Sequence, residues 1–170
     1  MSKILILDAV SLINILERCE SKNLIDYFKE INIEFHVVKE VINEFNKKPK
    51  EIGKTRLQES IDTSIIEIIE FDQENIDLSV LIKLNGLDEG ELVSALYHME
   101  NREYKLVSDD NAAHKILLEN FEITCLWTTN LLQILIDNEV IDVDEVKTIY
   151  QEMKKNGFWG VKRPVFRKRK

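Results

Sequence analysis

The chain has 170 residues, of which 44% are hydrophobic, and a formal net charge of -8. This length suffices for one sizeable hydrophobic core and leaves little room for a second domain. Cys19 and Cys125 stand far apart and outside any zinc-ligand spacing, so neither a disulfide framework nor a zinc site is indicated. No segment approaches the roughly 20 apolar residues of a membrane span, and Asp8 interrupts the apolar N-terminus too early for a signal peptide. We therefore expect a cytoplasmic protein with no membrane association.

Strand-like and helix-like patterns alternate along the chain. In order, they predict a strand at 4–7, helices at 9–18 and 22–30, a strand at 34–38, helices at 39–45 and 55–62, a strand at 65–69, helices at 73–84 and 88–100, a strand at 104–108, a helix at 111–119, a strand at 123–126 and helices at 130–137 and 142–154. This alternation implies right-handed crossovers and a mainly parallel central sheet, in a three-layer α/β/α sandwich. Ligands of such sheets bind beyond the carboxyl ends of the strands.

Positive charge is concentrated at the C-terminus. Residues 161–170 contain six basic side chains and no acid, which leaves 17 basic against 31 acidic residues, a net charge of -14, in the rest of the chain. The acidic part would repel nucleic acid, whereas the basic segment could hold phosphates; a solvated terminus is the alternative. We therefore divide the chain into a domain over 1–155 and a basic tail over 156–170. Phe158 and Trp159, just before the basic residues, either stack on unpaired bases or anchor the tail.

Acidic residues follow the predicted strands at the edge where a ligand is expected. Asp8 follows the first strand, Asp109 and Asp110 follow the fourth, Glu91 lies in the first turn of the sixth helix, and Glu44 lies on the helix after the second strand. Each has a structural alternative, as a helix cap, as part of a capping box or as a solvated helix residue.

Several acids at one edge would repel one another unless a cation neutralised them. Oxygen ligands of this kind suit Mg²⁺ or Mn²⁺, and such an ion could activate water and stabilise the charge on a phosphodiester. Phosphodiester hydrolysis is the chemistry that fits. By contrast, His36, His98 and His114 are not spaced as ligands of one metal, so we expect them to be structural.

Segments in this order resemble the motifs of the PIN domain superfamily, which is known for metal-dependent ribonucleases. The run from Ile6 to Ile13 is similar to the opening motif, and the run from Val38 to Phe45 to the second. The first match implies that Asp8 is a metal ligand supported by Ser11; the second implies a site role for Glu44.

Three later segments extend the resemblance. Residues 87–91, Leu-Asp-Glu-Gly-Glu, resemble the L-D-x-G-E opening of one branch, which gives Glu91 a site role. Residues 106–110 resemble the fourth motif, in which Asp110 is the ligand by register and Asp109 is the alternative. Residues 127–132 are similar to a G-T-x-G-x-L segment but lack both glycines.

The resemblance implies an endoribonuclease with RNA as substrate, and many such enzymes are the toxins of toxin-antitoxin pairs, which is the role expected here. Asp8, Glu91 and Asp110 would hold one or two Mg²⁺ or Mn²⁺ ions, Glu44 would bind a second ion or orient water, and Asp109 would assist. It also implies a homodimer and an antitoxin partner. The tail would bind the RNA backbone through five basic residues: Lys162, Arg163, Arg167, Lys168 and Arg169. The alternative is a non-catalytic RNA-binding or regulatory module with the same fold.

Overall fold

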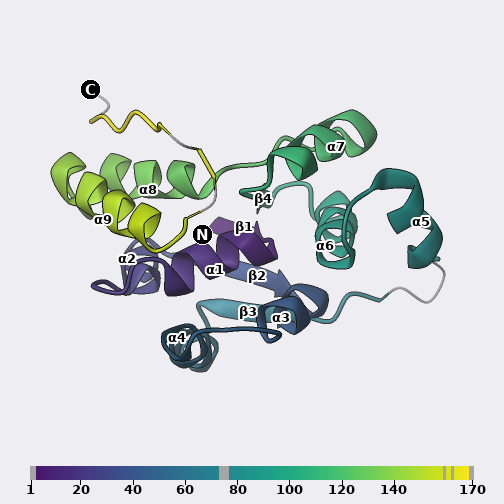
Figure 1. Ribbon diagram of the computed structural model, residues 1–170, viewed down its shortest axis with the longest axis horizontal. Helices are drawn as coiled ribbons and strands as arrows, with labels where there is room; N and C mark the ends of the chain where they lie inside the picture. The colour runs from purple at the N-terminus through teal and green to yellow at the C-terminus, as the bar shows by residue number, and fades with distance from the viewer. Residues whose placement is uncertain (1–2, 73–76, 159, 162, 169–170) are drawn as a thin grey trace.

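A four-stranded parallel sheet forms the centre of the molecule (Figure 1). The computed structural model describes residues 3–72, 77–158, 160–161 and 163–168. The strands are β1 (Lys3–Leu7), β2 (Ile33–Val38), β3 (Ile66–Ile69) and β4 (Lys105–Val107), arranged in the order β3-β2-β1-β4. All three strand pairs are parallel, with Leu5 opposite both Phe35 and Lys105. The carboxyl ends of the four strands therefore meet at one edge, as the alternation of elements predicts.

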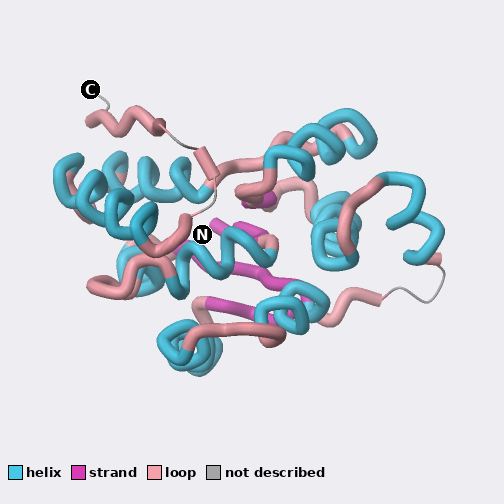
Figure 2. The backbone as a smooth tube through the Cα atoms, viewed as in Figure 1, coloured by secondary structure: helices cyan, strands magenta, loops and turns pink. Residues whose placement is uncertain are grey.

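Helices cover both faces of the sheet, as Figures 1 and 2 show. They are α1 (Ala9–Glu17), α2 (Leu24–Glu30), α3 (Lys39–Phe45), α4 (Glu51–Asp62), α5 (Leu78–Asn85), α6 (Glu89–Glu100), α7 (Asn111–Phe121), α8 (Thr128–Asp137) and α9 (Val143–Lys155). None of these helices is long and apolar enough to cross a membrane.

Alternate residues of β1 enter two different hydrophobic cores, because successive side chains of a strand point to opposite faces. Leu5 and Leu7 pack with α1, α2, α8 and α9, whereas Ile6 packs with α6 and α7. All three are at most 5% exposed. Burial on both faces explains why this strand is an uninterrupted aliphatic run.

The predicted strand at 123–126 is wrong: the segment forms one parallel bridge, between Val107 and Leu126. Leu126 donates its backbone N–H to the Leu106 carbonyl at 2.8 Å and accepts from the Ser108 N–H at 2.9 Å. The neighbouring β4 is only three residues long, and α8 begins two residues after Leu126, so few ladder positions exist. The predicted helix at 73–84 is observed as α5; residues 73–76 lie outside the described part of the chain.

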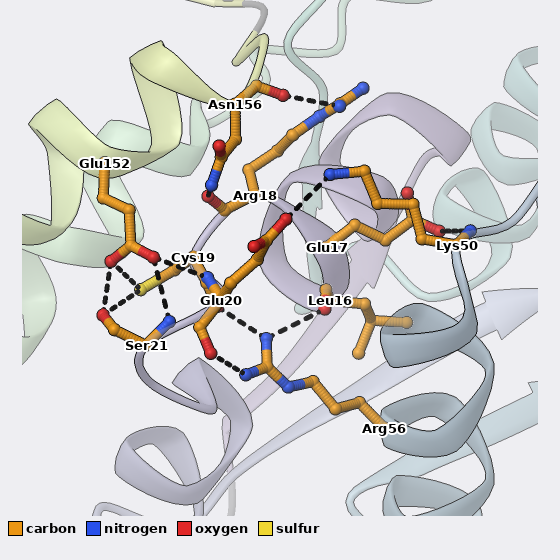
Figure 3. A network of polar contacts seen from close by, with 10 residues as sticks. All are labelled: Leu16, Glu17, Arg18, Cys19, Glu20, Ser21, Lys50, Arg56, Glu152 and Asn156. Carbon is orange, nitrogen blue, oxygen red and sulfur yellow. Dashed lines mark hydrogen bonds and ion pairs between the residues drawn. The ribbon is translucent and has the colours of Figure 1, made fainter.

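The end of α1 is held by a buried arginine from α4, shown in Figure 3. Arg56 is 7% exposed and donates to the carbonyls of Leu16 at 3.1 Å, Cys19 at 2.6 Å and Glu20 at 3.0 Å. The last carbonyls of a helix lack partners within the helix and carry its negative partial charge, so a cation is favourable there. This contact fixes α1, whose other end carries Asp8.

We expect Arg56→Met to lower the free energy of unfolding by about 3 kcal/mol, because three carbonyl oxygens lose a charged donor. Urea unfolding followed by circular dichroism measures the change. Lys54→Ala is the matched control on the same helix, since the Lys54 side chain is 53% exposed and its partner among the described residues is Glu51, one turn away. Equal losses in the two variants would contradict the assigned role of Arg56.

Candidate active site

Asp8 lies where β1 ends and α1 begins, at the carboxyl edge of the sheet. It is 2% exposed, and its Oδ1 accepts the Ser11 backbone N–H at 2.7 Å, which caps α1. Its Oδ2 is buried and has no hydrogen-bond partner among the described residues. Burial raises the pKa of Asp8 to about 7, although the nearby Ser108 hydroxyl and the Ser11 N–H oppose the rise. A buried carboxylate oxygen without a partner is unfavourable, so a positively charged ligand beside it would be stabilising.

Glu91 lies in the first turn of α6 and completes a capping box with Asp88. The Glu91 N–H donates to Asp88 Oδ1 at 2.8 Å, and the Asp88 N–H donates to Glu91 Oε2 at 3.0 Å. Burial, followed by the charge of Asp88, raises the pKa of Glu91 to about 7, and the charges of Asp8 and Asp110 add to the rise. Glu91 is therefore both a cap and a member of an acidic group with Asp8 and Asp110.

The glycine of the L-D-x-G-E segment allows α6 to approach α3 closely. A Cβ atom at Gly90 would lie 3.0 Å from Val41 Cγ2 and 3.5 Å from the Val41 backbone nitrogen. A larger residue would force Val41 or the start of α6, where Glu91 lies, to shift.

The neighbours Asp109 and Asp110 have different environments. Asp109 is 4% exposed and accepts from Ser11 Oγ at 3.3 Å, from Asn14 Nδ2 at 2.8 Å and from both the N–H (3.0 Å) and the hydroxyl of Thr128. Burial raises the pKa of Asp109, and the bonds from Thr128 and Asn14 oppose the rise. Asp110 is half-buried and caps α7 through Ala112 and Ala113, with one oxygen accepting both N–H groups.

Asp109 therefore ties α1 to the start of α8. We expect Thr128→Val, which keeps the side-chain shape and removes the hydroxyl donor to Asp109, to lower the free energy of unfolding by about 1.5 kcal/mol. Chemical unfolding measures it. Thr129→Val is the control, because Thr129 is similarly buried at 5% exposed and none of the hydrogen bonds that hold Asp109 involves its hydroxyl. A loss in Thr129→Val as large as in Thr128→Val would show that the bond to Asp109 is not the cause.

Glu44 lies on α3, beside the capping box. It borders a hollow of 280 Å³ together with Glu40, Asn43 and Asp88, among others. Burial and the charge of Asp88 raise the pKa of Glu44, and Lys47 opposes them. Glu44 is thus connected to Glu91 through their shared neighbour Asp88.

Within the described residues, no three His, Cys, Asp or Glu side chains are close enough together to hold one ion. The acidic group nevertheless fits a hard cation, because its donors are all carboxylate oxygens and one of them, Asp8 Oδ2, is buried without a partner. Mg²⁺ usually binds to proteins through one or two carboxylates and several waters, so a three-residue cage is not required.

Asn14 was not recognised from the sequence, although it bonds directly to Asp109. Its signal was available: Ser11 and Asn14 are spaced i, i+3 on a helix rich in apolar residues, and both prove to be at most 1% exposed. Two of the three histidines bond to other described residues. His114 bonds to the Ser108 carbonyl at 2.7 Å and stacks on Trp127 with ring centroids 3.7 Å apart, and His36 bonds to the Tyr97 hydroxyl at 2.7 Å.

The described part of the tail packs on α8 and α9, in the region where Figure 1 draws the C-terminal segment. Phe158 and Phe166 both make edge contacts with Tyr150, whose hydroxyl donates to the Val161 carbonyl at 2.6 Å. The Arg167 backbone pairs with Gln133, and Lys168 lies 3.0 Å from Glu139. Among the other predicted tail residues, Arg163 is described and exposed, whereas Trp159, Lys162 and Arg169 lie outside the described residues.

Comparison with known proteins agrees with this architecture. A family model described as DUF3368: PIN domain matches residues 4–168, which is nearly the whole chain. A search of curated proteins found no match. Proteins of the matched kind are generally nucleases and typically bind divalent metal ions. The sheet order, the acidic residues at its carboxyl edge and this match together show that the chain belongs to the PIN domain family.

Proposed function

We propose that the protein is a metal-dependent endoribonuclease. Asp8, Glu91 and Asp110 would hold one or two Mg²⁺ or Mn²⁺ ions, and Glu44 would bind a second ion or orient water. One observation carries the proposal: the buried Asp8 has a carboxylate oxygen without a partner among the described residues and lies within electrostatic reach of Glu91. A divalent cation would give the Asp8 oxygen a partner and would neutralise the repulsion between Asp8 and Glu91.

When bound, the ion would lower the pKa of an attacking water and neutralise charge on the phosphodiester. The chain itself supplies the positioning. Ser11 keeps one oxygen of Asp8 engaged through its backbone N–H, so the other oxygen is directed away from the helix cap. The capping box holds Glu91 at the start of α6 by the same principle. The carboxylates are thus oriented by helix starts rather than by one another.

Different roles follow for the two aspartates at the end of β4. Both oxygens of Asp109 accept hydrogen bonds from Ser11, Asn14 or Thr128, so little capacity remains for a cation. Asp110 uses one oxygen for its cap and raises the pKa of Glu91 by its charge. We assign the ligand role to Asp110 and a positioning role to Asp109.

Purified protein should cut a mixed panel of single-stranded RNAs in Mg²⁺ or Mn²⁺ and leave them intact in EDTA. A matched DNA panel tests whether the sugar matters, and Asp8→Asn serves as the inactive control. Metal-dependent cutting of RNA but not DNA supports the proposal. Intact RNA in every condition would favour the second candidate, a non-catalytic PIN module, which should still bind RNA.

The family resemblance also suggests partners: a second copy of the chain, and an antitoxin protein that blocks the site. The tail is proposed to add affinity for the RNA backbone, with Arg163, Arg167 and Lys168 among its basic residues. In the described tail only Lys168 is paired with an acid, so the other two cations are available to phosphate.

A further inference from the structure

One face of α1 borders a hollow beside the acidic group. The hollow has a volume of 270 Å³ and is lined by Val10, Ile13, Asn14, Arg18, Asp109 and Asp110. The positions 10, 14 and 18 are four residues apart, so they follow one side of the helix. Val10 and Ile13 are only half-buried, unlike Leu12, which faces the core. The hollow therefore combines an apolar wall, a cation at one end and the carboxylates of the proposed site at the other.

Arg18 is a half-buried cation with unused hydrogen-bond donors. Its Nη1 donates to the Asn156 carbonyl at 2.7 Å, while its Nε is shielded from solvent and has no partner among the described residues. No described carboxylate lies within ion-pairing distance of its guanidinium, although Asp109 and Asp110 border the same hollow. Figure 3 shows the remaining terminal nitrogen pointing away from the residues drawn.

These features fit a phosphate better than a structural ion pair. An arginine carries five N–H donors in a planar fork that matches phosphate oxygens, and leaving buried donors unmet is costly. A stretch of ten residues along α1 separates Asp8 from Arg18, a helix rise of about 15 Å. Arg18 would therefore meet a different phosphate from the one at Asp8.

We propose that the hollow along α1 is a subsite for single-stranded RNA next to the cleaved bond. Arg18 binds a backbone phosphate there, and Val10 and Ile13 contact the sugar or base between that phosphate and the acidic group. This inference rests on the proposed function, because it assumes that RNA is the substrate and that it binds beside Asp110.

Binding of a short single-stranded RNA is to be measured in the Asp8→Asn background, which holds the RNA intact, over a range of salt concentrations. Loss of one phosphate contact on a single strand reduces the slope of log affinity against log salt by about 0.7. We expect this reduction in Arg18→Met, together with about tenfold weaker binding. Arg18→Lys should keep the slope. In the protein with Asp8 intact, Arg18→Met should raise KM and leave kcat unchanged.

Asn156→Ala is the matched control. Asn156 Nδ2 donates to the Arg18 carbonyl at 3.0 Å, so this variant loosens the same link between α1 and α9 while it keeps the cation. Its salt slope should equal that of the parent protein. An unchanged slope in Arg18→Met, or an equal change in Asn156→Ala, would overturn the subsite and leave the nuclease proposal standing. Failure of the intact protein to cut any RNA would overturn both.

Discussion

Cleavage of RNA by the Asp8→Asn protein is expected to be at least about 100-fold slower than cleavage by the wild type, because several kcal/mol of metal-dependent stabilisation depend on this charge. Asparagine keeps the size of the side chain and an oxygen that can accept the Ser11 N–H, so the cap of α1 survives. What disappears is the negative charge at the buried oxygen that has no described partner. Single-turnover rates at saturating Mg²⁺ measure the effect on the chemical step.

The variant must also be shown to fold. Far-ultraviolet circular dichroism and urea unfolding at pH 8 should give a protein at least as stable as the wild type, since a buried charge has been removed. Wild-type cleavage rates in a folded Asp8→Asn protein would refute the assignment of Asp8 and, with it, the proposed metal site. A slow but folded variant separates lost chemistry from lost structure.

Much of the fold follows from local patterns in the sequence. The run Ile4-Leu5-Ile6-Leu7 indicates a strand buried on both faces, and its two cores are the physical reason. The segment at 123–126 shows the limit of such patterns. Ile123 and Cys125 are both buried, as in a strand. Strand pairing, however, also depends on the length of the neighbouring strand, and the sequence of the segment itself does not encode that length.

The positions of the acids at the sheet edge were predictable because parallel strands end at one edge, but their hydrogen-bond partners were not. The sequence favoured Asp110 by register without excluding Asp109. Their surroundings differ because Asp109 accepts bonds from Asn14 of α1 and Thr128 of α8, two helices that are separate along the chain. Such contacts depend on how α1 and α8 pack against each other. The spacing of residues within one segment carries no information about that packing.

The structure of the tail was also not predictable from composition alone. Its composition, six basic residues in ten, left a solvated terminus and a phosphate-binding segment as equal interpretations. The contacts of Phe158 and Phe166 with Tyr150 show a described tail that packs on α9. Anchoring and phosphate binding are compatible, because the aromatic side chains face the domain while Arg163 stays exposed.

Stability should depend on pH through Asp8 in a direction opposite to that of an ordinary surface carboxylate. The folded-state pKa of Asp8 is about 7, against 3.8 as its ordinary value, so the unfolded chain releases the proton first as pH rises. In EDTA, the contribution of Asp8 to folding is therefore fully present below about pH 4 and is lost as pH rises to about 7. A difference of this size corresponds to about 4 kcal/mol.

The comparison of wild type with Asp8→Asn isolates this contribution, since asparagine does not titrate and the other carboxylates are shared. The variant's advantage in unfolding free energy should grow by about 4 kcal/mol between pH 4 and pH 8 in EDTA. If the difference in unfolding free energy between the two proteins were constant across this range, the pKa of Asp8 would not be raised by burial.

Mg²⁺ added at pH 8 should restore stability to the wild type, by about 2.7 kcal/mol at 100 times its dissociation constant, and should leave Asp8→Asn nearly unchanged. At pH 5 the same ion should stabilise the wild type much less, because Asp8 and Glu91, both with pKa values of about 7, hold their protons there. Equal stabilisation at both pH values would place the ion elsewhere. The repulsion that makes the metal-free site unfavourable near neutral pH is thus the source of its affinity for a cation.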